Sequence, residues 1–197
     1  MVKVNLIVAV CAESWGMGCR QDLPWKLPSE KAIFRRLTQS TRDPSKRNAN
    51  IMARKCWEAA PCYGTPRKNQ ENIIVSRSMK CLEPQIAQLD AERNSRTVVV
   101  DSYEEATRYA ARLQEEGSVE TVWNTGGAVA YRLGMEHDSF HRLYLTKIYK
   151  EFECDAFMPA VDFSNLTDVT ASVAEVPQGP LEENGVRFEY FVFERKT

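Results

Sequence analysis

The most informative part of the chain is residues 16–34, which read GMGCRQDLPWKLPSEKAIF. Apolar residues such as Ile33 and Leu37 follow its Asp-Leu-Pro-Trp motif at helical spacing, and Ser29 precedes them as a cap. This pattern predicts an amphipathic helix with Glu30 in its first turn. The helix amino end favours the charge of this carboxylate, whereas burial among apolar neighbours disfavours it. On the helix alone, a plain helix-stabilising role for Glu30 is the more common explanation. The loop before the helix favours instead a group that binds a cationic ring and helps to move a proton.

The composition is that of an ordinary globular protein. The chain has 197 residues, 43% of them hydrophobic, and its 26 basic and 27 acidic side chains leave a net charge of −1. We expect one domain over residues 1–197 and no binding to nucleic acid or a membrane surface. The longest apolar run, Leu6 to Ala12, is far short of a membrane span and is predicted to be a buried strand. Six cysteines without a Cys-x-x-Cys pair are typical of reduced thiols, so we expect a cytoplasmic protein.

Short apolar runs alternate with helical patterns along the chain. This alternation predicts an α/β three-layer sandwich with a central mixed, mostly parallel β-sheet, and the alternating polarity of the last run predicts one antiparallel C-terminal arm. The predicted strands are Val4 to Val10, Ala49 to Met52, Asn72 to Ser76, Thr97 to Val100, Thr121 to Trp123, Arg142 to Ile148 and Val186 to Glu194. The predicted helices are Ser29 to Gln39, Lys55 to Ala60, Tyr103 to Glu116 and Gly127 to Leu133.

Further motifs follow residues 16–34 in a fixed order. Together with that stretch they are Ile7-Val8-Ala9-Val10, Ile51-Met52 with Arg54-Lys55, Ser76-Arg77, Gly126-Gly127 with Tyr131, Leu145-Thr146, and Phe152-Glu153-Cys154-Asp155 running to Pro159. In this order, over residues 4–195, the chain resembles the dihydrofolate reductase family. The resemblance implies a monomeric enzyme of dihydrofolate-reductase-like fold that reduces 7,8-dihydrofolate to 5,6,7,8-tetrahydrofolate with NADPH. Such an enzyme supplies one-carbon metabolism and thymidylate and purine synthesis, and it binds dihydrofolate and antifolate-like small molecules.

The resemblance also implies catalytic roles for four residues. Glu30 would bind the pterin amino group and ring N–H and promote proton delivery to nitrogen 5 through water, while hydride goes to carbon 6. Thr146 would orient Glu30 by a hydrogen bond, Trp25 would position a water, and Leu23 would close over the nicotinamide. The substrate-binding set implied is Ile7, Val8, Glu30, Phe34, Arg35, Thr125, Tyr131 and Thr146.

The cofactor site is predicted from backbone and charge. Arg54-Lys55 opens a helix directly after a strand, where free N–H groups and positive charge would both face a pyrophosphate. The glycines of Gly126-Gly127 allow close approach of the backbone, and the family holds this bond cis. Each motif taken alone is more often a plain surface charge or a turn. The resemblance assigns the 2′-phosphate to Arg77. The full implied set is Ala9, Gly16, Met17, Gly18, Asp22, Leu23, Arg54, Lys55, Cys56, Ser76, Arg77, Gly126, Gly127, Ala128, Val129 and Tyr131.

Several positions depart from the family pattern. Gln70 stands where an arginine normally clamps the glutamate carboxylate of folate, and glutamine cannot supply a bidentate charged fork. Arg35, Arg67 or Lys68 would have to replace it, and the sequence does not choose among them. Asp101 sits near where a basic residue often assists the 2′-phosphate, which would weaken the preference for NADPH. Lys31 follows Glu30 where an apolar residue usually touches the substrate, which bears on inhibitor selectivity.

Two alternatives to this enzyme remain open. One is a folate- or nucleotide-binding paralogue without turnover, which would be expected to lose Glu30 or Thr146. The other is a reductase of another pterin or pyrimidine, which Gln70 alone favours. No metal site is predicted, because His137 and His141 fall in a stretch predicted to be a loop and lack a third ligand.

Overall fold

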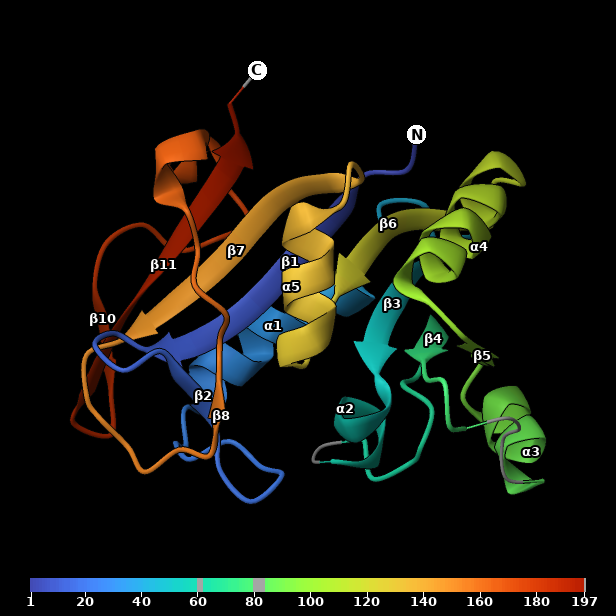
Figure 1. Cartoon of the computed structure of the whole chain (residues 1–197), viewed down its shortest axis with the longest axis horizontal. Coiled ribbons are helices and arrows are strands. Elements are labelled where there is room, and N and C mark those ends of the chain that lie inside the picture. The colour runs from blue at the N-terminus through green and yellow to red at the C-terminus, as the bar shows by residue number, and fades with distance from the viewer. Residues whose placement is uncertain (60–61, 80–83, 197) are drawn as a thin grey trace.

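A mixed β-sheet forms the centre of the protein. The computed structural model describes residues 1–59, 62–79 and 84–196. Within them the strand order is β10-β11-β7-β1-β6-β3-β4-β5, and β9 pairs with β11. The strands are β1 Val4–Cys11, β3 Arg47–Ala53, β4 Gln70–Val75, β5 Arg96–Val100, β6 Val119–Asn124, β7 Phe140–Ile148, β9 Leu166–Asp168, β10 Leu181–Glu183 and β11 Val186–Arg195. Pairing is parallel from β7 through β1 to β5 and antiparallel at β11, which confirms the predicted fold class (Figure 1).

Helices cover both faces of this sheet. They are α1 Pro28–Gln39, α2 Arg54–Glu58, α3 Gln85–Glu92, α4 Tyr103–Glu115 and α5 Ala128–Glu136. Successive side chains of β1 point to opposite faces of the sheet. On one face, Leu6 and Val8 pack in a core cluster with residues of α4 and α5 such as Ala106 and Tyr131. Cys11, on the other face of β1, packs in a second cluster that includes residues of α1. Figure 1 shows α5 in front of the sheet and α1 behind it.

The start of α1 differs from the prediction. Leu27 is the N-cap and Pro28 takes the first helical position, where its missing N–H costs nothing, so Ser29 lies inside the helix. The Ser29 main-chain N–H and hydroxyl both donate to Glu183 Oε2, at 3.0 and 2.7 Å. The prediction that Ser29 caps the helix was therefore wrong. Ser29 instead binds Glu183, a residue of β10 far along the chain.

Some other elements were not predicted from the sequence. Helix α3 carries few apolar residues in a regular pattern, and strands β2 (Gly16–Gly18) and β8 (Ala156–Phe157) are too short and glycine-rich to show alternation. Strand β7 begins at Phe140, so His141 lies in a strand and the predicted loop was wrong there. The predicted end of the second helix, Ala60, lies outside the described residues. None of the helices in the described ranges is long and apolar enough to cross a bilayer, and no cluster of potential metal ligands occurs there.

The direction of the parallel strands determines which edge of the sheet carries the predicted binding residues. Strands β1, β3, β4 and β6 run in one direction, so their carboxyl ends meet at one edge of the sheet. Arg54, Ser76 and Gly126 all follow the last residues of these strands within two positions. In open α/β sheets ligands bind in the crevice outside this edge.

Candidate active site

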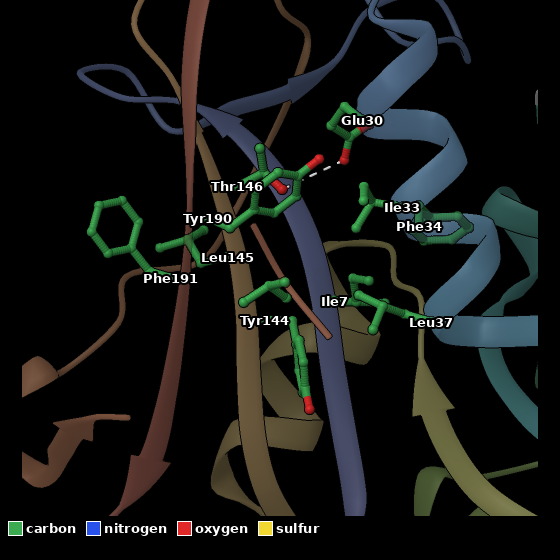
Figure 2. A pocket seen from close by; sticks show the side chains of 11 residues that line it. Ile7, Glu30, Ile33, Phe34, Leu37, Tyr144, Leu145, Thr146, Tyr190 and Phe191 are labelled. Atoms are coloured by element: carbon green, nitrogen blue, oxygen red, sulfur yellow. Dashed lines mark hydrogen bonds between the residues drawn. The ribbon is translucent and has the colours of Figure 1, made fainter. Parts of the chain in front are cut away.

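Glu30 is a buried carboxylate on the first turn of α1. Its side chain is only 7% exposed, and Thr146 Oγ1 on β7 donates a hydrogen bond to Glu30 Oε1 at 3.5 Å (Figure 2). Burial raises the pKa of Glu30 to about 7, while the Thr146 hydroxyl and the charge of Lys31 lower it. The group therefore exchanges its proton near neutral pH, where an acid–base catalyst is most effective.

The pocket around Glu30 is otherwise mostly apolar. Its lining residues come from α1 and from strands β1, β7 and β11, with one more from the loop before β10. They are Ile7, Glu30, Ile33, Phe34, Leu37, Tyr144, Leu145, Thr146, Val176, Tyr190 and Phe191. The low polarity of this lining explains the raised pKa of the Glu30 carboxylate.

Tyr190 is a polar residue of this pocket that sequence reasoning missed. The register places it opposite Thr146 between β11 and β7, and Thr146 is in turn opposite Ala9 on β1. Its hydroxyl is buried without a hydrogen-bond partner among the described residues. Burial and the charge of Glu30 raise its pKa above the ordinary range. The only signal in the sequence was strand alternation, which cannot tell which strand lies alongside.

The glycine-containing loop before α1 is held against a distant segment. Cys19 and Asp22 exchange two main-chain hydrogen bonds of 2.9 and 3.0 Å. The Asp155 carboxylate accepts from the Arg20 main-chain N–H at 2.8 Å, and the Asp155 N–H donates to Gly18 at 3.0 Å. At the end of this loop the side chain of Leu23 is 41% exposed. Hydrogen bonds to Asp155 and between Cys19 and Asp22 therefore hold the loop, while the apolar side chain of Leu23 at its end remains exposed.

Trp25 lies next to the loop in the interior. It is 4% exposed and meets the Phe152 ring edge-on, with 5.9 Å between ring centroids. Its indole Nε1 is buried and has no hydrogen-bond partner in the described part of the chain. Buried indole N–H groups usually find a partner, so this donor is suited to a ligand or a water.

The two glycines after β6 bring several predicted residues together. The peptide bond between Gly126 and Gly127 is cis, and the Gly126 carbonyl accepts from the Ala53 N–H at 2.6 Å. A Cβ on Gly126 would lie 2.7 Å from the Tyr131 ring, and one on Gly127 would lie 3.2 Å from Cys56 Sγ. The Tyr131 hydroxyl donates to the Ile7 carbonyl at 2.8 Å. The two glycines therefore let the main chain after β6 pack closely against the side chains of Tyr131 and Cys56.

A second, wider pocket lies beyond these glycines. It is lined by Ala53, Val75, Ser76, Arg77, Asp101, Ser102, Tyr103, Glu104, Val129, Ala130, Arg132, Leu133, Glu136 and His137. The Ser76 hydroxyl accepts from the Met79 N–H at 2.9 Å, which fixes the turn after β4 and leaves the exposed Arg77 at the pocket. Arg54 instead pairs with Glu58 at 2.7 Å within α2. Of the basic residues predicted to bind phosphate, Arg77 is the one at this pocket.

Comparison with known proteins gives one result over the whole chain. The family profile described as Dihydrofolate reductase matches residues 3–195. The chain belongs to the dihydrofolate reductase family. A Drosophila melanogaster protein named dihydrofolate reductase is 37% identical over 197 residues, which is 100% of this chain and of that protein. The Gallus gallus protein of the same name is 32% identical over 99% of this chain and 97% of its own. The solved structure of Schistosoma mansoni dihydrofolate reductase superposes with a TM-score of 0.78 at 28% identity, covering 99% of each chain.

Some residues implied by the dihydrofolate reductase pattern lie away from the pocket. The Val8 side chain points to the opposite face of the sheet, into the core formed with α4 and α5. Arg35 is exposed on the outside of α1. Thr125 turns inward, and its hydroxyl donates to Asn50 Oδ1 at 2.8 Å. At Val8 and Thr125 only main-chain atoms remain available to a ligand.

The Gly126 geometry gives a prediction for this member of the dihydrofolate reductase family. Gly126→Ala is expected to lower the free energy of unfolding by more than about 1 kcal/mol, because φ is +99° and a Cβ would meet the Tyr131 ring. Urea unfolding measures the change. Gly117→Ala is the matched control, since Gly117 also has a positive φ of +75° but nothing within 4 Å of an added Cβ. Equal losses for the two variants would contradict the ring contact.

Proposed function

We propose that the chain reduces 7,8-dihydrofolate to 5,6,7,8-tetrahydrofolate in an NADPH-dependent reaction. The observation that carries this proposal is Glu30, a lone carboxylate buried in an apolar pocket with a pKa of about 7. A pterin ring offers an amino group and a ring N–H side by side, which match the two oxygens of one carboxylate. Thr146 fixes the orientation of that carboxylate through its hydroxyl.

The rest of the pocket suits a flat aromatic ring. Ile7 and Phe34 offer apolar surface beside Glu30. The Ile7 carbonyl already accepts from Tyr131, and its second lone pair is available to a ligand donor. These groups would hold the ring with its polar edge toward Glu30 and leave the reacting carbon toward the glycine pair.

Proton delivery is assigned to Glu30 acting through water. The buried Trp25 Nε1 is the donor suited to hold that water. The loop that ends at Leu23 would exclude bulk solvent when its exposed side chain covers the cleft. Glu30 thereby promotes delivery of a proton through this water to nitrogen 5 of the pterin at neutral pH.

The residues present fit a dinucleotide cofactor. Gly126 and Gly127 allow the main chain after β6 to pack closely against Tyr131 and Cys56, and the wider pocket offers Ser76 and the exposed guanidinium of Arg77. NADPH, when bound, supplies the hydride that reduces carbon 6 of the pterin. Arg77 would hold its 2′-phosphate by a charge-assisted contact, with the Asp101 carboxylate lining the same pocket.

An absorbance assay tests the proposed reaction. NADPH and dihydrofolate together are expected to lose absorbance at the nicotinamide band when the protein is added, and either compound alone is not. Binding of both compounds without this loss would instead favour a non-catalytic paralogue. Loss with other dihydropterins but not with dihydrofolate would favour a different reductase.

The role of Arg77 gives a prediction about cofactor choice. Arg77→Gln is expected to weaken NADPH binding about ten- to a hundredfold, the range for a hydrogen bond to a charged group. Binding of NADH, which lacks the 2′-phosphate, should stay nearly unchanged. Fluorescence titration with both cofactors measures this, and an equal loss for the two would contradict the assignment.

Three further properties stay predictions. They are the monomeric state, the single domain over residues 1–197 and the cytoplasmic location. Supply of tetrahydrofolate to one-carbon metabolism is the role that follows from the proposed reaction.

A further inference from the structure

We propose that Arg67 is the receptor for a carboxylate on the tail of the substrate. The proposal rests on the proposed function, because dihydrofolate carries a benzoyl ring that ends in glutamate carboxylates. It deepens that function by naming the group in this chain that distinguishes a tailed, acidic substrate from a bare pterin.

The Arg67 guanidinium lies beside an aromatic ring that lines the pocket around Glu30. Its central carbon is 5.4 Å from the centroid of the Phe34 ring, and Phe34 lines the pocket that contains Glu30. Burial raises the pKa of Cys56 to about 11, and the positive charge of Arg67 opposes this rise. The same charge opposes the rise in the pKa of Tyr131, which is caused chiefly by burial. The guanidinium therefore lies near one residue of each of three helices: Phe34 on α1, Cys56 on α2 and Tyr131 on α5.

One end of this guanidinium is buried and unsatisfied. Arg67 Nη1 is shielded from solvent and has no hydrogen-bond partner among the described residues. Arg67 Nε donates to Cys62 Sγ at 3.3 Å, which is a weak acceptor for a charged donor. A buried cationic N–H without an oxygen acceptor is costly, and contact with a phenylalanine ring satisfies it only in part. A carboxylate is the ligand that restores such a donor, because its two oxygens match the guanidinium fork.

The backbone holds Arg67 in this place. The Arg67 N–H donates to Asn72 Oδ1 at 3.1 Å, and its carbonyl accepts from Asn72 Nδ2 at 3.3 Å. Asn72 is fully buried on β4, so the segment before the strand is fixed to the sheet. The side chain thus starts from a defined point and reaches the ring on α1.

The other residues considered for this role either form hydrogen bonds within the protein or are exposed. Gln70 is 0% exposed, and its Nε2 donates to the Thr38 carbonyl at 2.6 Å. Gln70 Oε1 accepts from Asn50 Nδ2 at 3.4 Å. Arg35 and Lys68 are both exposed. Arg67 alone of these candidates combines a positive charge with a buried, unsatisfied donor beside Phe34.

The expected ligand chemistry follows from this pair of contacts. An aromatic ring would pack on Phe34, and a carboxylate attached to that ring by a short link would meet Arg67 Nη1. Dihydrofolate has this arrangement in its benzoylglutamate tail. A neutral amide of the same size would keep the ring contact and lose the charge contact.

The test compares dihydrofolate with its bis-amide, in which both glutamate carboxylates are neutral. For the wild-type protein, kcat/KM is expected to be at least about tenfold higher for dihydrofolate, as for a hydrogen bond to a charged group. Arg67→Leu should lower kcat/KM for dihydrofolate about ten- to a hundredfold, mainly through KM, and change the bis-amide by less than about threefold. Arg67→Lys should keep part of the preference, because a point charge replaces the fork.

A matched control separates this effect from the loss of an arginine on a ring. Arg112 on α4 lies 5.1 Å from the centroid of the Tyr109 ring, so Arg112→Leu removes the same kind of contact outside both pockets. The substrate ratio is expected to stay at the wild-type value in this variant. Thermal unfolding by circular dichroism checks that each variant is folded.

Several outcomes would overturn the assignment to Arg67. A wild-type ratio near one would do so without any variant. Equal losses on both substrates in Arg67→Leu would make its role structural, and faster turnover of both would make it an obstruction of the cleft. Loss of the ratio in Arg35→Leu or Lys68→Leu, with Arg67→Leu unaffected, would move the receptor there. If the wild type turns over neither substrate, the proposed reaction fails separately, and titration of tryptophan fluorescence with the two compounds still measures the tail preference.

Discussion

Glu30→Gln is expected to lower the turnover of dihydrofolate at pH 7 by at least about a hundredfold, the scale of a general-acid contribution. Glutamine keeps the size of the side chain, but it has one acceptor oxygen instead of two and cannot take up or release a proton. NADPH affinity should barely change, because Glu30 does not line the wider pocket that contains Arg77. Steady-state turnover and a separate cofactor titration measure the two effects.

The pH dependence of this variant is as informative as the loss itself. The rate of the wild-type protein should fall as pH rises through about 7, where Glu30 loses its proton. The deficit of Glu30→Gln should shrink as pH falls, since solvent then protonates the pterin without help. Thr146→Val should show a milder defect of the same kind, because it removes the hydroxyl that donates to the carboxylate. A Glu30→Gln protein with wild-type turnover at neutral pH would contradict the proposed mechanism.

The same substitution is expected to stabilise the ligand-free protein at pH 8 by about 1–3 kcal/mol. Glu30 ionises near pH 4.5 in an unfolded chain, but its pKa in the folded protein is about 7. Between these values the folded protein binds more protons than the unfolded chain, so the free energy of unfolding falls as pH rises. Above about pH 7 the folded protein holds a buried charge that glutamine does not carry.

Urea unfolding of both proteins at pH 4, 6 and 8 measures this prediction. The difference in unfolding free energy should be near zero at pH 4 and largest at pH 8. Glu115→Gln is the control, because Glu115 is exposed on α4 and surface substitutions of this kind stay within about 0.5 kcal/mol. A difference between wild type and Glu30→Gln that is independent of pH would contradict the raised pKa. The burial that raises the pKa of Glu30 for proton delivery therefore also lowers the free energy of unfolding above about pH 7.

Much of this fold could be predicted because its signals are local. Apolar strands such as Val4–Cys11 and the amphipathic α1 follow from hydrophobic periodicity within one segment. The burial of Glu30 also followed, because its neighbours in the helix and the preceding loop are apolar. By contrast, the engagement of Ser29 by Glu183 depends on a residue 154 positions away. No local pattern encodes such a contact.

The same limit explains what was missed in the candidate site. Tyr190 enters the pocket only because β11 pairs with β7 in a register that sets it opposite Thr146. Gln70 was recognised as a departure from the family pattern, but three basic residues remained as its replacement. Spacing along the chain could not choose among them, because the direction of a long side chain depends on tertiary packing. The ring contact of Arg67 with Phe34 is a property of the folded protein alone.

Hydride transfer from NADPH to dihydrofolate can be followed by an isotope experiment. The protein is incubated with dihydrofolate and NADPH that carries deuterium at both positions of nicotinamide carbon 4. The product is expected to be tetrahydrofolate with one deuterium at carbon 6, detected by mass spectrometry and located by nuclear magnetic resonance. Cofactor oxidation that yields unlabelled tetrahydrofolate, or no tetrahydrofolate, would contradict hydride transfer from NADPH to carbon 6.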